Sequence, residues 1–154
     1  MSPGRFLAAE FSRGRALVGE AGHLSFRTGA AATPMRLELS SLRRLALVFR
    51  PRYEALVPGA VALLVLLAAP WLGVRLLAAG VLLLGLGIAL AMRRYTLVLE
   101  SSGGMETRWD LGVMRRGSDL EQRVWGCWLT LVLVGHALGV RVEEPAADRD
   151  VPGA

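Results

Sequence analysis

Side chains of the types that perform catalysis or bind metals are few in this 154-residue chain. Its histidines are His23 and His136, and its single cysteine is Cys127, with no spacing typical of a zinc site. Cys127 lies within an apolar stretch, which favours a buried structural thiol over a nucleophile. His136 could ligate a haem or a pigment, although a histidine near a helix end more often bonds a carbonyl or reaches solvent. We therefore predict no catalytic residue, no metal site, no cofactor and no enzyme activity, with His136 as the one candidate cofactor ligand.

The charged residues give no stronger sign of a reaction. Glu100, Glu106 and Asp110 lie close together in sequence with Arg108, and we expect them to pair across or solvate an exposed β-ribbon. All 18 basic residues are arginines, and they are scattered without a nucleic-acid-binding signature. We predict no nucleic-acid partner.

The most prominent feature of the sequence is an apolar block at residues 55–92. Its only charge is Arg75, next to a break that begins at Pro70. The candidate helices on either side, 56–72 and 76–92, would each cover roughly 25 Å at about 1.5 Å per residue, slightly less than a hydrocarbon core of about 30 Å. We predict a two-span transmembrane helical hairpin.

Arginines bracket this block and predict its orientation. We predict a multi-pass protein of the bacterial inner membrane. By the positive-inside rule, the arginines place both chain termini on the cytoplasmic side. At the turn, Trp71 suits the membrane interface and Arg75 can reach water from it. The bracketing residues are Arg50, Arg52, Arg93 and Arg94.

Small residues in the block mark where helices could approach closely in lipid. The candidate packing positions are Gly59, Gly80, Gly85 and Gly87. They could serve packing within the hairpin, contact with another membrane subunit, or both, because each helix has two faces.

The flanking sequence has strand character separated by turn residues. Before the block we expect strands at residues 5–11, 15–18, 23–28, 35–39 and 42–49. After it, strands at 95–100 and 105–113 flank Gly103 and Gly104, which indicates a β-hairpin because glycine tolerates the positive φ of such turns.

A capped helix should follow the hairpin. Ser118 and Glu121 have capping-box spacing, and Gly139 is a suitable terminator. The helix is unusually apolar at 129–134, which suggests burial on more than one side. Residues 124–140 therefore leave open a third membrane span, while residues 140–154 read as a flexible tail.

This order of strands, two-helix hairpin, Arg-Arg-Tyr-Thr-Leu-Val-Leu-Glu-Ser-Ser-Gly-Gly strand pair and capped helix resembles a group of uncharacterised bacterial membrane proteins. In those proteins a transmembrane hairpin interrupts a pleckstrin-homology-like (PH-like) cytoplasmic domain. The resemblance implies an α+β membrane protein with a small antiparallel PH-like sheet or barrel and a closing C-terminal helix. Residues 1–54 and 93–139 would form one cytoplasmic domain around the hairpin at 55–92. The resemblance brings no catalytic residues with it.

The function expected from these features is that of a small integral membrane accessory or scaffolding subunit. It would contact membrane lipids and bind a larger membrane complex, or another copy of itself, through protein–protein interactions. An alternative is a sensor of anionic lipids or small ligands, because residues 1–54 carry nine arginines against four glutamates. A subunit bearing a cofactor or pigment at His136 is the third reading.

Overall fold

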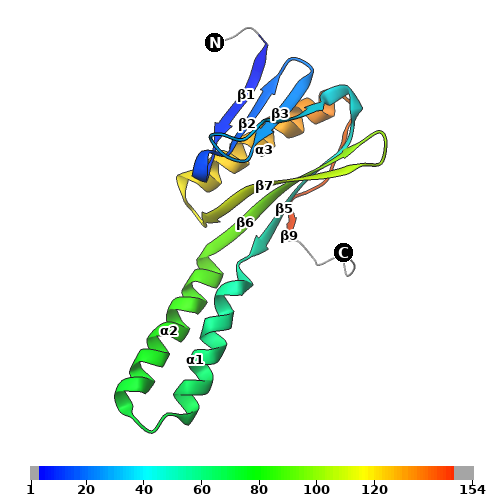
Figure 1. Ribbon diagram of the computed structural model, residues 1–154. Helices are drawn as coiled ribbons and strands as arrows, with labels where there is room; N and C mark the ends of the chain where they lie inside the picture. The colour runs from blue at the N-terminus through cyan, green and yellow to red at the C-terminus, as the bar shows by residue number, and fades with distance from the viewer. Residues whose placement is uncertain (1–3, 148–154) are drawn as a thin grey trace. The chain divides into compact units, whose positions relative to one another are not determined.

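The protein, whose computed structural model describes residues 4–147, divides into two compact units (Figure 1). Met1–Phe49 and Arg94–Ala154 form the first, which we call the sheet unit, and Arg50–Arg93 form the second, the helical unit. The helical unit is thus a single insertion into the chain of the sheet unit. Its bounds lie within five residues of those expected from the sequence.

One sheet of the sheet unit is built from the first four strands, in the order β1-β2-β3-β4 with antiparallel pairing. Its register places Leu17 of β2 opposite Ala9 of β1 and Phe26 of β3. Because side chains alternate along a strand, Leu17, Leu24 and Phe26 share the buried face. The strands are β1 (Arg5–Glu10), β2 (Ala16–Glu20), β3 (His23–Arg27) and β4 (Met35–Glu38).

The second sheet has the order β7-β6-β5-β8, with β9 also paired to β5. A turn with Gly104 at φ +75° connects β6 to β7, as the paired glycines predict. Residues 140–147 differ from the expected flexible tail, because β8 and β9 both pair with β5 in parallel. The strands are β5 (Leu42–Pro51), β6 (Met92–Ser101), β7 (Glu106–Arg115), β8 (Arg141–Val142) and β9 (Ala146–Ala147).

Helix α3 (Asp119–Ala137) has both of its predicted ends. Ser118 Oγ accepts a hydrogen bond from the Glu121 N–H at 3.3 Å. At the other end, the N–H of Val140 bonds the Gly135 carbonyl at 2.8 Å and the N–H of Gly139 bonds the His136 carbonyl at 3.2 Å, which is a Schellman motif with Gly139 at φ +71°.

The core of the sheet unit lies between its two sheets and α3. Phe26 and Trp109 stack with ring centroids 5.4 Å apart, which joins β3 to β7. From α3, the buried face contributes Val124, Cys127, Trp128 and Leu131. The third span that the sequence left open at residues 124–140 gains no support, since α3 has 19 residues but is not apolar enough to qualify as a membrane span.

The helical unit contains a short 3-10 turn η3 (Tyr53–Ala55) followed by helices α1 (Leu56–Ala68) and α2 (Leu72–Ala91). Within residues 4–147, α2 is the one helix long and apolar enough to cross a membrane. It has 20 residues and is about 30 Å long at about 1.5 Å per residue. By contrast α1 has 13 residues, which is about 20 Å by the same rise.

The predicted two-span transmembrane hairpin is therefore wrong, and the multi-pass topology that rested on it loses its support. The reason lies at Pro70. A residue that precedes proline is disfavoured in helical geometry, and Ala69 is extended at φ −73° and ψ 130°, so α1 stops at Ala68 instead of continuing to residue 72. The connection therefore lies at residues 69–71 instead of the expected 73–75, and Arg75 lies in the first turn of α2.

Candidate functional site

The most unusual surface of the molecule is the apolar surface of the helical unit. Both helices expose large aliphatic side chains along their length, several of them to about two thirds of their area. Exposed apolar surface of this extent marks a site that contacts lipid or another protein. The residues more than 60% exposed are Val57, Leu64, Leu67, Trp71, Leu72, Leu76, Leu77, Leu83, Leu84 and Leu90.

The two ends of the helical unit lie side by side. The N–H of Arg52 donates to the Met92 carbonyl at 3.3 Å, so the chain enters and leaves the unit at the same place. Arg50 and Arg93 bound the unit there, and Arg52 forms a 3.8 Å ion pair with Glu54. Basic side chains are thus concentrated at one end of an otherwise apolar pair of helices. Arg94, the fourth predicted anchoring arginine, is exposed and begins the second segment of the sheet unit.

Arg75 closes the opposite end of the helical unit. Its Nε donates a 2.7 Å hydrogen bond to the carbonyl of Ala69, at the C-terminus of α1, where helix carbonyls otherwise lack partners. A cation at this position also interacts favourably with the helix dipole. Trp71 lies in the same connection and is 75% exposed. Arg75 therefore has a structural role at the turn besides carrying the unit's isolated charge.

The four predicted packing glycines divide into two pairs. Gly59 and Gly85 are buried where α1 meets α2, and a Cβ atom built on Gly85 would lie 2.7 Å from the carbonyl oxygen of Ala55. Only a glycine permits that approach. A Cβ atom on Gly80 or Gly87 would meet nothing within 4 Å, so these two lie on the outer surface of α2.

The residues considered for catalysis or cofactor binding, Cys127, His136 and His23, do not form a common site in the described part of the chain. Cys127 is buried, and burial raises the pKa of its thiol to about 11, which keeps it protonated at neutral pH. His136 is exposed in the last turn of α3, and His23 is exposed in β3. In the described part of the chain, residues 4–147, histidine, cysteine and carboxylate side chains form no group of three that could hold a metal ion.

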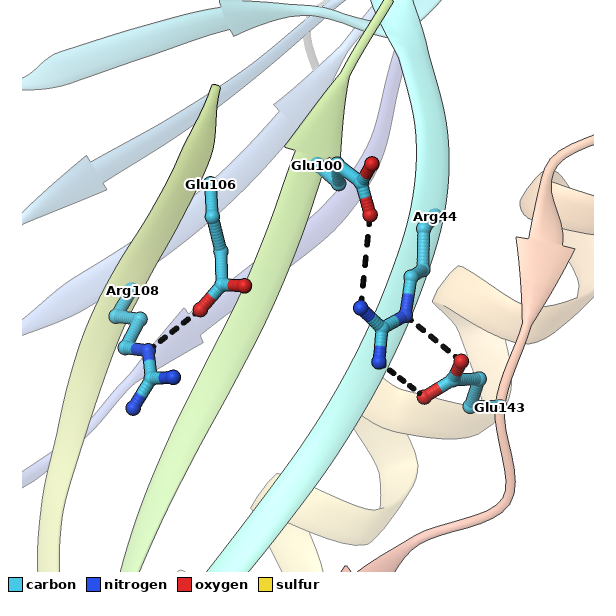
Figure 2. A network of polar contacts seen from close by, with 5 residues as sticks. All are labelled: Arg44, Glu100, Glu106, Arg108 and Glu143. Carbon is cyan, nitrogen blue, oxygen red and sulfur yellow. Dashed lines mark hydrogen bonds and ion pairs between the residues drawn. The ribbon is translucent and has the colours of Figure 1, made fainter. Parts of the chain in front are cut away.

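A polar network does form on the second sheet, around Arg44 of β5 (Figure 2). Arg44 donates from Nε and Nη2 to the two carboxylate oxygens of Glu143 at 2.7 and 2.8 Å, and lies 3.5 Å from Glu100 through Nη1. The hydrogen bond from Arg44 lowers the pKa of Glu143, and the same bond raises the pKa of Arg44. Glu106 and Arg108 form a separate pair along β7 at 2.6 Å.

The Arg44–Glu143 pair could not be found by sequence reasoning, because 99 residues separate the two and the expected tail began before Glu143. The carboxylates expected to pair across the β-ribbon or to solvate it have partners in different parts of the sheet unit. Glu100 belongs to the Arg44 network, and Asp110 pairs with Arg15 at 3.3 Å. These pairs tie neighbouring strands and the C-terminal segment together, which gives them a structural role.

Comparison of the chain with protein-family models, with curated proteins and with solved structures found no match. The resemblance to PH-like membrane proteins therefore stays a prediction. Among the described residues, the exposed apolar surface of the helical unit is the feature with the clearest functional consequence.

Proposed function

We propose that the protein is a membrane-anchored accessory or scaffolding subunit. The helical unit enters the lipid from the cytoplasmic side, and the sheet unit remains in water as the part that meets a larger membrane complex. The observation that carries this proposal is the apolar surface of α1 and α2, interrupted by Arg75 alone and bounded at its other end by Arg50, Arg52 and Arg93.

Physical chemistry favours lipid over water for this unit. Each fully exposed leucine that leaves water contributes roughly 1.5–3 kcal/mol, and many such side chains act together here. Arginines at the end where the chain enters can lie among anionic headgroups on the cytoplasmic surface, each contributing on the order of 1 kcal/mol. The orientation follows from the same arginines through the positive-inside rule.

The exposed face of α3 supports the accessory role. Leu129 and Leu133 are four residues apart, so they lie on one face of the helix, and they are 61% and 72% exposed. This face is opposite to the one that fills the core with Val124, Cys127 and Leu131. A partner protein that covers Leu129 and Leu133 would explain why α3 is apolar on both sides.

The anchoring half of the proposal is tested by alkaline extraction of bacterial membranes. The wild-type protein should stay with the lipid pellet, while the double variant Leu64→Glu/Leu84→Glu should move to the soluble fraction. The matched control Leu129→Glu/Leu133→Glu makes the same change at similarly exposed leucines of the sheet unit and should stay in the pellet. Release of the wild-type protein by alkali would overturn the anchor.

The accessory half is tested by purification from native membranes in mild detergent. A partner should be recovered in stoichiometric amount with the wild-type protein and lost with Leu129→Glu/Leu133→Glu. A protein that stays monomeric and recovers no stoichiometric partner would count against an accessory role, whatever the result of extraction.

A further inference from the structure

The outer face of the first sheet carries a cavity that the proposed membrane anchor does not use. It has a volume of about 560 Å³ and is lined by residues of β1, β2, β3 and the loop before β4. This volume falls within the range of roughly 300–1,000 Å³ found for small-molecule sites. All of the lining residues belong to the sheet unit, so the inference is independent of how the protein meets a membrane.

Short side chains make the floor of the cavity. The strand register places Ala8, Val18 and Ser25 in one row across β1, β2 and β3, on the face opposite to Leu17 and Phe26. Three small residues side by side leave a hollow where larger ones would fill the surface. Ala32 and Pro34, from the connection between β3 and β4, also line it. The floor is therefore made of short and mostly apolar side chains.

The charged groups of the cavity are two arginines and one glutamate, Arg5, Arg27 and Glu10. Arg27 Nε is shielded from solvent and has no hydrogen-bond partner in the structure. No ion pair joins Arg5 or Arg27 to Glu10 within the described residues. A buried guanidinium N–H without an acceptor is unfavourable, and most buried polar groups in native proteins have a partner.

A second, smaller hollow of about 280 Å³ adjoins the first. It shares Arg5, Val18, Ser25 and Pro34 with the larger cavity and adds Arg36. A third guanidinium thus lines the groove that the two adjoining hollows form, against the carboxylates of Glu10 and Glu20. The excess of positive charge favours an anion.

We propose that this groove binds a small organic oxyanion, a carboxylate or phosphate attached to a compact apolar group. The oxyanion accepts hydrogen bonds from Arg27, whose planar fork matches two oxygens of such a group, and Arg5 supplies further positive charge. The apolar part lies on Ala8, Val18 and Pro34. Such a ligand would bring an acceptor to the Arg27 guanidinium and fill the hollow at the same time.

The experiment measures binding of hexyl phosphate to the full-length protein in phosphatidylcholine nanodiscs by isothermal titration calorimetry. Replacing Arg27 with Gln should weaken binding by about tenfold or more, since hydrogen bonds to charged groups are among the stronger ones. Arg43→Gln is the matched control, because Arg43 is exposed in β5 and lies outside the cavity lining, and it should bind as the wild type does. Hexanol, which has the apolar chain without the anion, should bind at least tenfold more weakly than hexyl phosphate.

A second variant tests the proposal if the Arg27→Gln protein does not fold. Ala8→Phe fills the cavity from an exposed position without changing its charge, and it should abolish binding while leaving the melting temperature near that of the wild type. Equal affinities of the wild type and both cavity variants, or of hexanol and hexyl phosphate, would overturn the proposal.

The source of the oxyanion is decided by repeating the titration in nanodiscs that contain phosphatidic acid. A lower apparent affinity for hexyl phosphate identifies a lipid headgroup as the competing occupant. An unchanged affinity identifies a soluble anion. Both results support the oxyanion site, and neither depends on the alkaline-extraction result.

Discussion

Arg44 and Glu143 form a two-pronged pair in which Nε and Nη2 donate to the two oxygens of one carboxylate at 2.7 and 2.8 Å (Figure 2). The pair lies beside the 2.9 Å bond from the Glu143 N–H to the Leu45 carbonyl, which continues the parallel pairing of β8 with β5. The side chains are 36% and 40% exposed. Solvent therefore screens the pair, and its importance is local: it holds the C-terminal segment against the sheet.

Replacing Glu143 with Gln should loosen the C-terminal segment without unfolding the protein. Because exposed ion pairs contribute at most about 1 kcal/mol, we expect a loss of less than about 1 kcal/mol in the free energy of unfolding. Hydrogen exchange at the Glu143 amide should accelerate, while exchange at core amides such as that of Leu97 should not change. Equal protection of the Glu143 amide in both proteins would show that β8 pairs without the ion pair.

Acid should produce the same loosening in the wild-type protein. Hydrogen bonding to Arg44 lowers the pKa of Glu143, so its stabilising contribution is present above the unfolded-state pKa of about 4.3 and is lost as pH falls through the lower folded-state value. The chemical shift of the Arg44 Nε–H proton should therefore change in the acid range below that of an ordinary glutamate. In Glu143→Gln this change should be much smaller, because Glu100 is then the one carboxylate left in the Arg44 network.

Much of the sheet unit could be predicted from its sequence because the signals were local. Strand limits agree with expectation to within about three residues, since glycine-containing turns separate the strands, and the Ser118 cap and Gly139 terminator fix α3. The length of α1 could not be obtained from counting apolar residues, because the conformation of Ala69 before Pro70 decides it.

The remaining features depend on contacts between distant segments. Glu143 finds Arg44 only after β8 has joined the sheet, and nothing near either residue in sequence indicates it. The cavity depends on three strands placing Ala8, Val18 and Ser25 in one row. The alternation of side chains within a strand identifies its buried face. Predicting a hollow on the opposite face also requires the register between strands, which the sequence of one strand does not contain.

The buried Glu121 should contribute more to stability than any exposed pair. Its carboxylate accepts hydrogen bonds from the Tyr95 hydroxyl and from the Gly117 N–H, which joins β6 to the start of α3. Tyr95→Phe removes one donor from a buried carboxylate and should lower the free energy of unfolding by about 1–3 kcal/mol. Urea denaturation of the protein in detergent measures the change.

Glu106→Gln is the control for that experiment. It breaks the exposed Glu106–Arg108 pair, and the expected loss is below about 1 kcal/mol. If Tyr95→Phe were no more destabilising than Glu106→Gln, the Tyr95–Glu121 hydrogen bond would contribute no more to the free energy of unfolding than an exposed ion pair does.

Gly85 should be the glycine of α2 that tolerates substitution least. In Gly85→Ala the new methyl group would lie 2.7 Å from the Ala55 carbonyl oxygen, so η3 must move away from α2, at a cost of about 1–3 kcal/mol. Gly87→Ala has open space and should stabilise α2 by up to about 1 kcal/mol. Thermal unfolding in detergent micelles compares the two. Similar melting temperatures would mean that α1 and α2 do not pack closely at Gly85.

Cys127 should react slowly with thiol reagents in the folded protein. At a pKa of about 11, about one thiol in a thousand is ionised at pH 8, and the side chain is buried besides. Labelling by a disulfide reagent should therefore accelerate strongly when guanidinium chloride unfolds the protein. Rapid labelling under native conditions would show that the core around α3 opens readily.

Spin-label accessibility can show whether α1 and α2 lie in lipid, as the proposed membrane anchor requires. In a Cys127→Ala background, labels are placed at Leu84 of α2 and at Leu129 of α3, which are 65% and 61% exposed. In lipid bicelles, the label at residue 84 should collide mainly with oxygen, which concentrates in hydrocarbon, and the label at residue 129 mainly with a water-soluble nickel chelate. Equal access of the nickel chelate to both labels would contradict the membrane anchor.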